Sequence, residues 1–187
     1  MLPNAGSTLE KIKQQEFYKA KIKESLIRGR PLILITVLLG NREISYIMRY
    51  LLQFPSEAQV RDYIISKLED DEPSDYIKYD KFEPYMLQVL MSNEFEPATA
   101  ERLLDAFKIL DPQGLGYVRK DVMHQLLTTK GIPLRPTEYD FFKQFAIGKD
   151  PEKIFYEDYV ARLIEENERH LDYLLKGYEN FKPSMGK

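Results

Sequence analysis

The chain contains no cysteine among its 187 residues. This absence excludes disulfide bonds, thiolate zinc sites and cysteine nucleophiles, and it fits a protein of a reducing, intracellular compartment. A strong excess of charge of one sign is missing too, because 30 acidic side chains face 27 basic ones and leave a net charge of −3. Binding of nucleic acid through phosphate contacts is therefore not expected.

Long hydrophobic runs are also missing. The strongest apolar stretch extends from Pro31 to Leu39, well short of the roughly 20 residues that cross a bilayer as a helix. We interpret this stretch as a buried helix or strand. The N-terminal residues lack the basic and then apolar layout of a secretory signal. The sequence therefore predicts a cytoplasmic protein that does not enter the membrane.

Motifs of known catalytic sites are absent as well. We find no glycine-rich phosphate loop, no nucleophile elbow and no zinc-protease helix motif. His124 and His170 fall in separate predicted helices, without cysteines or regularly spaced carboxylates to complete a metal site. The carboxylates of residues 69–72 are better explained as the remnant of an ion-binding loop than as acid–base catalysts. We expect no catalytic residue and no enzymatic activity.

What the chain does contain is a short phrase that occurs four times. In each copy an apolar residue is followed, five positions later, by a second apolar residue that opens a helix. The repeat interval of roughly 35 to 40 residues is the length of a helix–loop–helix unit. The four pairs are Leu39 with Ile44, Ile77 with Phe82, Val118 with Met123, and Ile154 with Tyr159.

Helix-start signals agree with this division. Ser56 and Gln59 have the spacing of a capping box, which predicts a helix over residues 56–69. Residues 136–140 repeat the signal, and Thr99 precedes another run of apolar residues at helical spacing. Both patterns predict further helices.

A polar stretch at residues 91–97 separates the chain into two halves. We therefore predict an N-terminal tail, two pairs of helix–loop–helix units and a helical extension with its own tail. Their ranges are 1–15, 16–94, 95–162 and 163–187.

The last predicted helix continues beyond its repeat unit. From about Glu157, apolar residues recur at spacings of three and four until Pro183, which indicates an amphipathic extension. Two interpretations are open: the extension packs back onto its own half of the chain, or it docks onto a partner helix or coiled coil. The candidate partner-binding residues here are Leu163, Leu171, Leu174, Leu175 and Tyr178.

The third repeat has a recognisable motif. Residues 106–122 read AFKILDPQGLGYVRKDV, and this segment resembles an EF-hand of the calmodulin family. Asp111 would open the 12-residue loop, Gly116 would sit at the sixth position, and Val118 at the eighth, where paired loops form a two-stranded contact. The resemblance implies an all-α, calmodulin-like fold of four degenerate EF-hand units in two lobes, followed by an extended C-terminal helix.

Among calmodulin-like proteins, the chain is similar to the EF-hand subunit-eight family of the axonemal nexin–dynein regulatory complex. The similarity lies in residues 16–24 (EFYKAKIKE), 42–44 (REI) and 72–86 (EPSDYIKYDKFEPYM). This family implies a non-catalytic component of the cilium or flagellum axoneme that helps to regulate dynein. The implied partners are helical or coiled-coil subunits of a larger axonemal complex, with the microtubule doublet as a further candidate.

One segment departs from the family. Where a first loop would be rich in polar residues, the chain has residues 28–31 (RGRP) and then the apolar run to Leu39. The fold of residues 28–40 is left open, because an alternative exon, an error of gene prediction and a true divergence would all give this pattern.

Calcium binding by an EF-hand loop needs oxygen ligands at positions 1, 3 and 5, a backbone carbonyl at 7 and a bidentate glutamate at 12. The third loop keeps Asp111 but has Leu115 at position 5 and Val122 at position 12. In the fourth loop, positions 1, 3 and 5 are occupied by Ile147, Lys149 and Pro151, and position 12 by Asp158. Neither loop is expected to bind calcium.

The second loop contains the weak candidates for a metal site, Asp70, Glu72 and Ser74, at the first three ligand positions. Lys81 stands at position 12, where its ammonium group would repel the ion. The first unit keeps Glu43 at position 12 but has mostly apolar residues upstream. We therefore expect no metal and no cofactor, calcium included, and an arrangement of helices that packing and partners set.

Basic residues are concentrated near the N-terminus, around apolar positions such as Ile12, Phe17, Ile22 and Leu26. Three interpretations are open: a solvated helix face, which we favour, a contact to an acidic surface such as tubulin or an acidic coiled coil, and a weak membrane-surface helix. The basic residues are Lys11, Lys13, Lys19, Lys21, Lys23, Arg28 and Arg30.

These observations predict a structural adaptor. Paired EF-hands form apolar grooves that clasp an amphipathic helix, and methionines suit such grooves because they adapt their shape. Met86, Met91 and Met123 are candidates for this surface and fit a plain core equally well. The alternative is a calcium-responsive or light-chain-like regulator bound to the helix of a motor or scaffold. Calcium dependence of partner binding would separate these two functions.

Overall fold

The structure is a computed structural model that describes residues 8–27, 38–69, 76–131 and 133–182. These residues form two compact units. Unit 1 consists of the described parts of residues 1–97 and 171–187, and unit 2 consists of those of residues 98–170.

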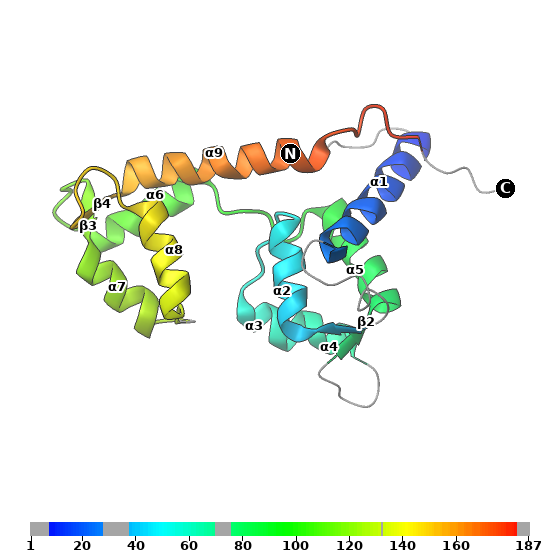
Figure 1. The fold of residues 1–187 in the computed structure, drawn as a ribbon, viewed down its shortest axis with the longest axis horizontal. Coiled ribbons are helices and arrows are strands. Elements are labelled where there is room, and N and C mark those ends of the chain that lie inside the picture. The colour runs from blue at the N-terminus through cyan, green and yellow to red at the C-terminus, as the bar shows by residue number, and fades with distance from the viewer. Residues whose placement is uncertain (1–7, 28–37, 70–75, 132, 183–187) are drawn as a thin grey trace. The chain divides into compact units, whose positions relative to one another are not determined.

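The described residues of unit 1 contain two helix–strand–helix repeats (Figure 1). Their elements are α1 (Thr8–Ile27), β1 (Leu38–Gly40) and α2 (Asn41–Tyr50), then α3 (Glu57–Gln59), η2 (Val60–Ile64), α4 (Ile65–Leu68), β2 (Tyr76–Lys78) and α5 (Tyr79–Ser92). The segments α3, η2 and α4 follow one another directly, and η2 has the wider turn of a π-helix. Together they form the helix that the capping box predicts.

Unit 2 repeats the same order of elements. They are α6 (Ala100–Leu110), β3 (Tyr117–Arg119), α7 (Lys120–Thr129), α8 (Pro136–Ala146), β4 (Lys153–Phe155) and α9 (Tyr156–Leu175). The prediction of a mainly helical chain built from four helix–loop–helix units is thereby confirmed. Among the described helices of both units, none combines the length and the apolar character that a membrane span requires.

Within the described residues, two short antiparallel ladders join the loops in pairs. Leu39 of β1 lies opposite Ile77 of β2, and Val118 of β3 lies opposite Ile154 of β4. All four side chains are buried. They are the first members of the repeated apolar pairs, so the sequence repeat marks the residue through which each loop meets its neighbour.

Side-chain caps fix where two of the helices begin. The hydroxyl of Ser56 accepts the N–H of Gln59 at 3.2 Å, and the Gln59 side chain accepts the N–H of Ser56 at 2.8 Å. The hydroxyl of Thr99 accepts the N–H of Arg102 at 3.2 Å at the start of α6. Helix α8 begins at Pro136, within the third predicted signal. These helix starts are therefore local properties of the sequence.

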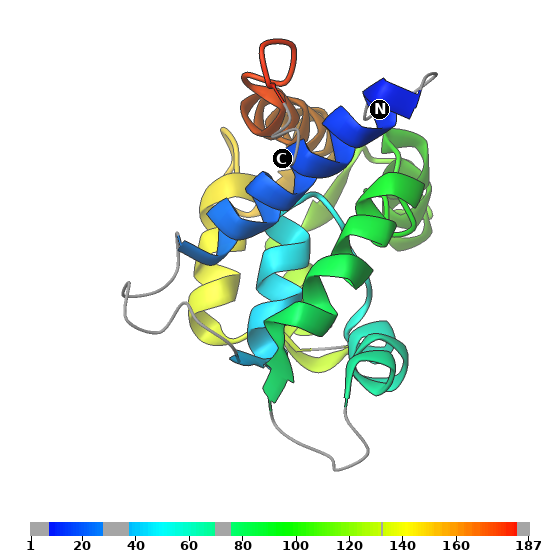
Figure 2. The ribbon, with the colours of Figure 1, turned by 90° about the vertical axis from the view of Figure 1, so that its right-hand side faces the viewer.

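The core of unit 1 forms where α1 lies against α2 and α5; Figure 2 shows α1, in blue, beside α5, in green. Helix α1 buries Phe17, Tyr18, Ile22 and Leu26. Met86 of α5 is fully buried in the same cluster. The apolar interior of unit 1 is thus closed by its own helices.

A buried glutamine ties the ends of α2 and α5 together. Gln53, which is 1% exposed, donates from Nε2 to Oδ1 of Asn93 at 3.0 Å and accepts the N–H of Phe95 at 3.1 Å. The N–H of Phe54 donates to the Phe95 carbonyl at 2.7 Å. Leu52 has a φ of 56°, a conformation that costs a non-glycine residue about 1–3 kcal/mol. The hydrogen bonds of Gln53 offset this cost and fix the path of the chain out of both helices.

The core of unit 2 is smaller. Its buried side chains are Phe107, Val118, Met123, Ala146, Ile154, Tyr156 and Val160. Further apolar side chains from α6, α7, α8 and α9 pack around this core but stay half-buried. We call them the half-buried surface of unit 2, and they are Leu103, Leu104, Leu127, Phe142, Tyr159 and Ile164.

Helix α9 ends earlier than the apolar spacing suggests. It stops at Leu175, and Gly177 then has a φ of 88°, in the left-handed region where glycine commonly ends helices. Tyr178 therefore lies beyond the helix. The predicted extension 163–187 is divided between the units, because its residues up to 170 belong to unit 2 and those from 171 belong to unit 1.

The node around Gln53 gives a first prediction. Gln53→Ala leaves the buried N–H of Phe95 without its acceptor, which we expect to lower the free energy of unfolding by about 1–3 kcal/mol. Urea denaturation followed by circular dichroism measures this change. The control Gln88→Ala lies on the exposed side of α5 and should stay within about 0.5 kcal/mol of the wild type. Equal effects of the two substitutions would contradict the role given to Gln53.

Candidate functional site

The third loop closes on the carboxylate of Asp111, the residue at ligand position 1. This carboxylate is 7% exposed and accepts the N–H groups of Leu115 at 3.0 Å and Gly116 at 2.8 Å. The hydroxyl of Tyr156 donates to the same carboxylate at 3.2 Å. Gly114 and Gly116 have φ values of 65° and 78°, which let the loop bend back on itself. The oxygens that would face an ion are therefore bonded to the chain's own donors.

These hydrogen bonds set the charge of both partners. The N–H of Leu115, aided by Gly116 and Tyr156, lowers the pKa of Asp111 despite the opposing effect of burial. Burial, and then the bond to Asp111, raises the pKa of Tyr156. At neutral pH Asp111 is thus ionised and Tyr156 protonated. The ring of Phe107 stacks on that of Tyr156 with centroids 5.6 Å apart and holds the hydroxyl in place.

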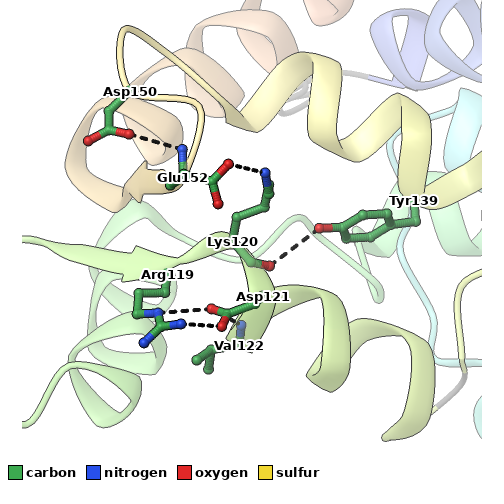
Figure 3. Close-up of polar contacts among 7 residues, drawn as sticks. All are labelled: Arg119, Lys120, Asp121, Val122, Tyr139, Asp150 and Glu152. Atoms are coloured by element: carbon green, nitrogen blue, oxygen red, sulfur yellow. Dashed lines mark hydrogen bonds and ion pairs between the residues drawn. The ribbon is translucent and has the colours of Figure 1, made fainter.

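The end of the third loop supplies an ion pair in place of a metal ligand. The carboxylate of Asp121 pairs with the guanidinium of Arg119, with one contact at 3.0 Å, and also accepts the N–H of Val122 at 2.9 Å (Figure 3). Val122 and Leu115, at positions 12 and 5, have hydrocarbon side chains that cannot coordinate calcium. Asp121 therefore pairs with a cation and a backbone N–H group in the first turn of α7.

Ion pairs also replace ligands in the fourth loop. Lys120 Nζ lies 2.6 Å from Glu152 Oε1 and links the two loops of unit 2, while the Lys120 carbonyl accepts the Tyr139 hydroxyl at 3.4 Å. Asp150 accepts the N–H of Glu152 at 2.9 Å and pairs with Lys153 at 3.3 Å. Figure 3 shows these contacts in succession, from Asp150 through Glu152 and Lys120 to Tyr139 of α8. The protein's own cations neutralise the carboxylates here.

Asp158, at position 12 of the fourth loop, lines an open cavity of about 650 Å³. Lys149 and Arg162 line the same cavity. Asp150 lines it too, but two carboxylates beside two cationic side chains do not provide the oxygen-rich shell that calcium requires.

In unit 1, the position-12 residues have other tasks. The carboxylate of Glu43 accepts the N–H of Gly40 at 2.7 Å and caps α2. The ammonium group of Lys81 donates to the carbonyl of Glu69 at 3.2 Å and ties the start of α5 to the end of α4. The weak metal candidates Asp70, Glu72 and Ser74 lie outside the described residues. Among the residues that are described, no three His, Asp or Glu side chains are grouped so as to hold a metal ion.

The eight candidate partner-binding residues occupy three environments. Buried core positions contain Met86, Met123 and Leu174. Half-buried positions packed on the core of unit 1 contain Leu171, Leu175 and Tyr178. Partly exposed positions contain Leu163 and Met91. Partner binding by these residues stays a prediction, and for the three core residues it would require the unit to open.

Sequence reasoning missed a set of exposed apolar side chains in unit 2. Ile109 is 79% exposed, Phe141 73% and Leu115 53%. One signal was available: Phe141 and Phe142 are adjacent in a helix and point about 100° apart, so both cannot face the core. Singly exposed apolar side chains are common on protein surfaces, so these three do not by themselves mark a binding surface.

The carboxylate of Asp111 gives a second prediction, on pH. Folding lowers the pKa of Asp111 below its ordinary value of 3.8. The carboxylate therefore contributes its full stabilisation above pH 3.8, and this contribution is lost as the pH falls through the pKa of the folded state. Asp111→Asn should lower the unfolding midpoint at pH 7, and its difference from the wild type should shrink in acid. Thermal melts from pH 7 to pH 3 measure this trend.

The control for this melt is Asp105→Asn, on the exposed surface of α6. It should change the midpoint little at any pH. A difference between Asp111→Asn and wild type that stays constant with pH would contradict the role of the charged carboxylate.

The loops give a third prediction, on calcium. Leu115, Val122 and Lys81 occupy ligand positions of the loops. The wild type should therefore have the same thermal unfolding midpoint in excess calcium as in a chelator. The double variant Leu115→Asp/Val122→Glu restores positions 5 and 12 of the third loop and should melt higher with calcium. A rise in the wild type that Asp70→Asn/Glu72→Gln abolishes would instead establish the second loop as a calcium site.

Known proteins resemble the chain in sequence. Dynein regulatory complex protein 8 of Mus musculus is 35% identical over 127 residues, which cover 67% of this chain and 77% of that protein. The probable calcium-binding protein CML14 of Arabidopsis thaliana is 32% identical over 123 residues, or 65% of this chain and 77% of that protein. No protein-family model matches the chain.

A solved structure resembles the fold. The structure of Mlc1p bound to IQ2 of Myo2p, a class V myosin, superimposes with a TM-score of 0.52 at 18% identity, covering 68% of this chain and 87% of that one. The fold is thus that of the EF-hand myosin light chains, which confirms the predicted calmodulin-like architecture. By sequence and fold together, the chain belongs to the calmodulin-like EF-hand family that includes dynein regulatory complex protein 8.

Proposed function

We propose that this chain is a non-catalytic adaptor subunit of the axonemal nexin–dynein regulatory complex, in which unit 2 binds an amphipathic helix of a larger subunit. The observation on which this proposal rests is the half-buried surface of unit 2. Its side chains come from α6, α7, α8 and α9, so a single helix laid across them would bury apolar groups of the whole unit.

Aromatic packing supports this choice of surface. The ring of Tyr159 meets the edges of Phe107, Phe142 and Phe145, with centroids 5.7, 5.7 and 5.9 Å apart. Such rigid aromatic clusters commonly supply most of the binding energy of an interface. Unit 1 also has half-buried apolar side chains on its core, but Leu171, Leu175, Tyr178 and Phe181 among them belong to its C-terminal segment.

The relatives support the cellular setting. Mouse dynein regulatory complex protein 8 is by its name a protein of that complex, and Mlc1p was solved bound to a myosin IQ segment. The matched proteins are regulatory or light-chain-like proteins. We extend these properties to this chain as a location in the axoneme of cilia or flagella, with helical or coiled-coil partners and the microtubule doublet nearby.

Internal hydrogen bonds and ion pairs in the loops of unit 2 favour constitutive binding. The Asp111 carboxylate is held by donors of the chain itself and the Asp150 carboxylate by the ammonium group of Lys153, so calcium would have to displace these partners. The alternative, a light-chain-like regulator on the helix of a motor, is favoured by the likeness to Mlc1p. The identity of the helix that co-purifies distinguishes the two.

A fourth prediction tests the proposal in cells. A tagged copy expressed in ciliated cells should remain with the microtubule doublets after detergent removes the membrane. Cross-linking should connect residues of the helices α6, α7, α8 and α9 to a helix of another subunit. Phe142→Ala removes one ring of the aromatic cluster and should weaken retention at least tenfold, or about 1.4 kcal/mol.

The matched control is Tyr46→Ala, which removes an aromatic ring that is 55% exposed in unit 1. It should be retained like the wild type. Loss of the wild-type protein on detergent extraction would contradict the axonemal setting, and normal retention of Phe142→Ala would contradict binding through unit 2.

A further inference from the structure

Two segments that sequence analysis marks for partner binding contact each other in unit 1. They are the basic helix α1 and residues 171–181, which we call the C-terminal strap. Phe17 of α1 meets the edges of the Tyr178 and Phe181 rings, with centroids 5.0 and 5.4 Å apart. Leu174 of the strap is 6% exposed and belongs to the core cluster of unit 1. The strap therefore covers an aromatic face of α1.

Polar contacts align the strap with α1. The hydroxyl of Tyr178 donates to Glu10 at 2.8 Å. Lys13 Nζ lies 4.8 Å from the centroid of the Tyr178 ring and donates to the carbonyl of Glu179 at 3.1 Å. Further along the helix, the Tyr173 hydroxyl donates to Glu24 at 3.2 Å. These contacts fix the position of the strap along the helix, and they engage part of the basic stretch that sequence analysis interprets as a solvated face.

Apart from the buried Leu174, the apolar side chains of the strap lie at the margin of the core of unit 1. Leu171, Leu175, Tyr178 and Phe181 are only half-buried, whereas Ile22 of α1 is fully buried. Contacts of α1 with α2 and α5 do not involve the strap. Release of the strap would therefore uncover Phe17 without dismantling the helices beneath it.

We propose that the C-terminal strap is an autoinhibitory segment that masks the Phe17 face of α1. The partner that displaces it is an amphipathic helix with apolar side chains at the strap's own spacing, that of Leu171, Leu174, Leu175, Tyr178 and Phe181. The strap and the partner helix compete for the Phe17 face of α1. Release of the strap therefore makes both that face and the strap's own apolar side chains available for binding. The masked face and the strap both belong to unit 1, and residues 171–175 of the strap form the end of α9.

A synthetic peptide of residues 168–182 tests the competition. Its fluorescence anisotropy is measured on titration with the full wild-type chain and with Tyr178→Ala/Phe181→Ala, in which the strap has lost both rings that meet Phe17. The variant should bind the peptide at least tenfold more tightly, because the wild type must first release its own strap. Tyr178→Phe, which removes only the bond to Glu10, should give an intermediate increase.

The matched control is Tyr46→Ala/Phe141→Ala, which removes two exposed rings outside the strap and should bind the peptide as weakly as the wild type. Equal binding by wild type and strap variant, or binding by neither, would overturn the proposal. Sedimentation that finds a wild-type dimer would also overturn it, since the strap would then cover a second copy. If the double variant loses its helical circular dichroism, Tyr178→Phe decides, and an unchanged affinity rejects the mechanism.

Discussion

The pairing of loops across each unit is the constraint on which the rest of the structure depends. Two ladders of three residues, centred on Leu39 with Ile77 and on Val118 with Ile154, join the loops. A two-stranded ladder of this length has little stability of its own, so the four buried apolar side chains supply it. In this way apolar burial contributes to fixing the relation between neighbouring helices.

At the ligand positions of the loops, hydrogen bonds are made to groups of the chain itself. Asp111 keeps the first ligand position, but its carboxylate binds two backbone N–H groups and the Tyr156 hydroxyl. Lys81, which replaces the glutamate of the second loop, ties two helices together through the Glu69 carbonyl. Hydrogen bonds within the chain thus hold the conformation of these loops.

The two units are built from the same helix–strand–helix repeat but differ in what covers their apolar side chains. Unit 1 fills its interior with α1, and the strap covers the Phe17 face of that helix. Unit 2 has a smaller core and leaves apolar side chains of α6, α7, α8 and α9 half-buried. Since burial of apolar area contributes to the binding of a helix, we propose unit 2 as the surface for a constitutive partner and unit 1 as the surface for a partner whose access the strap controls.

Local chemistry was readable from the sequence alone. The loop anchors Leu39, Ile77, Val118 and Ile154, the caps at Ser56 and Thr99, and the missing ligands at Leu115 and Val122 each depend on a few neighbouring residues, so spacing was enough to predict them. Tertiary structure decided what covers each apolar face. Spacing shows which side chains share a face, but not whether the chain itself or solvent covers it. Hence Met86 proved buried and Met91 partly exposed, Phe141 lay outside the core, and Tyr178 met Phe17 across more than 150 residues of chain, a contact that only long-range packing could create.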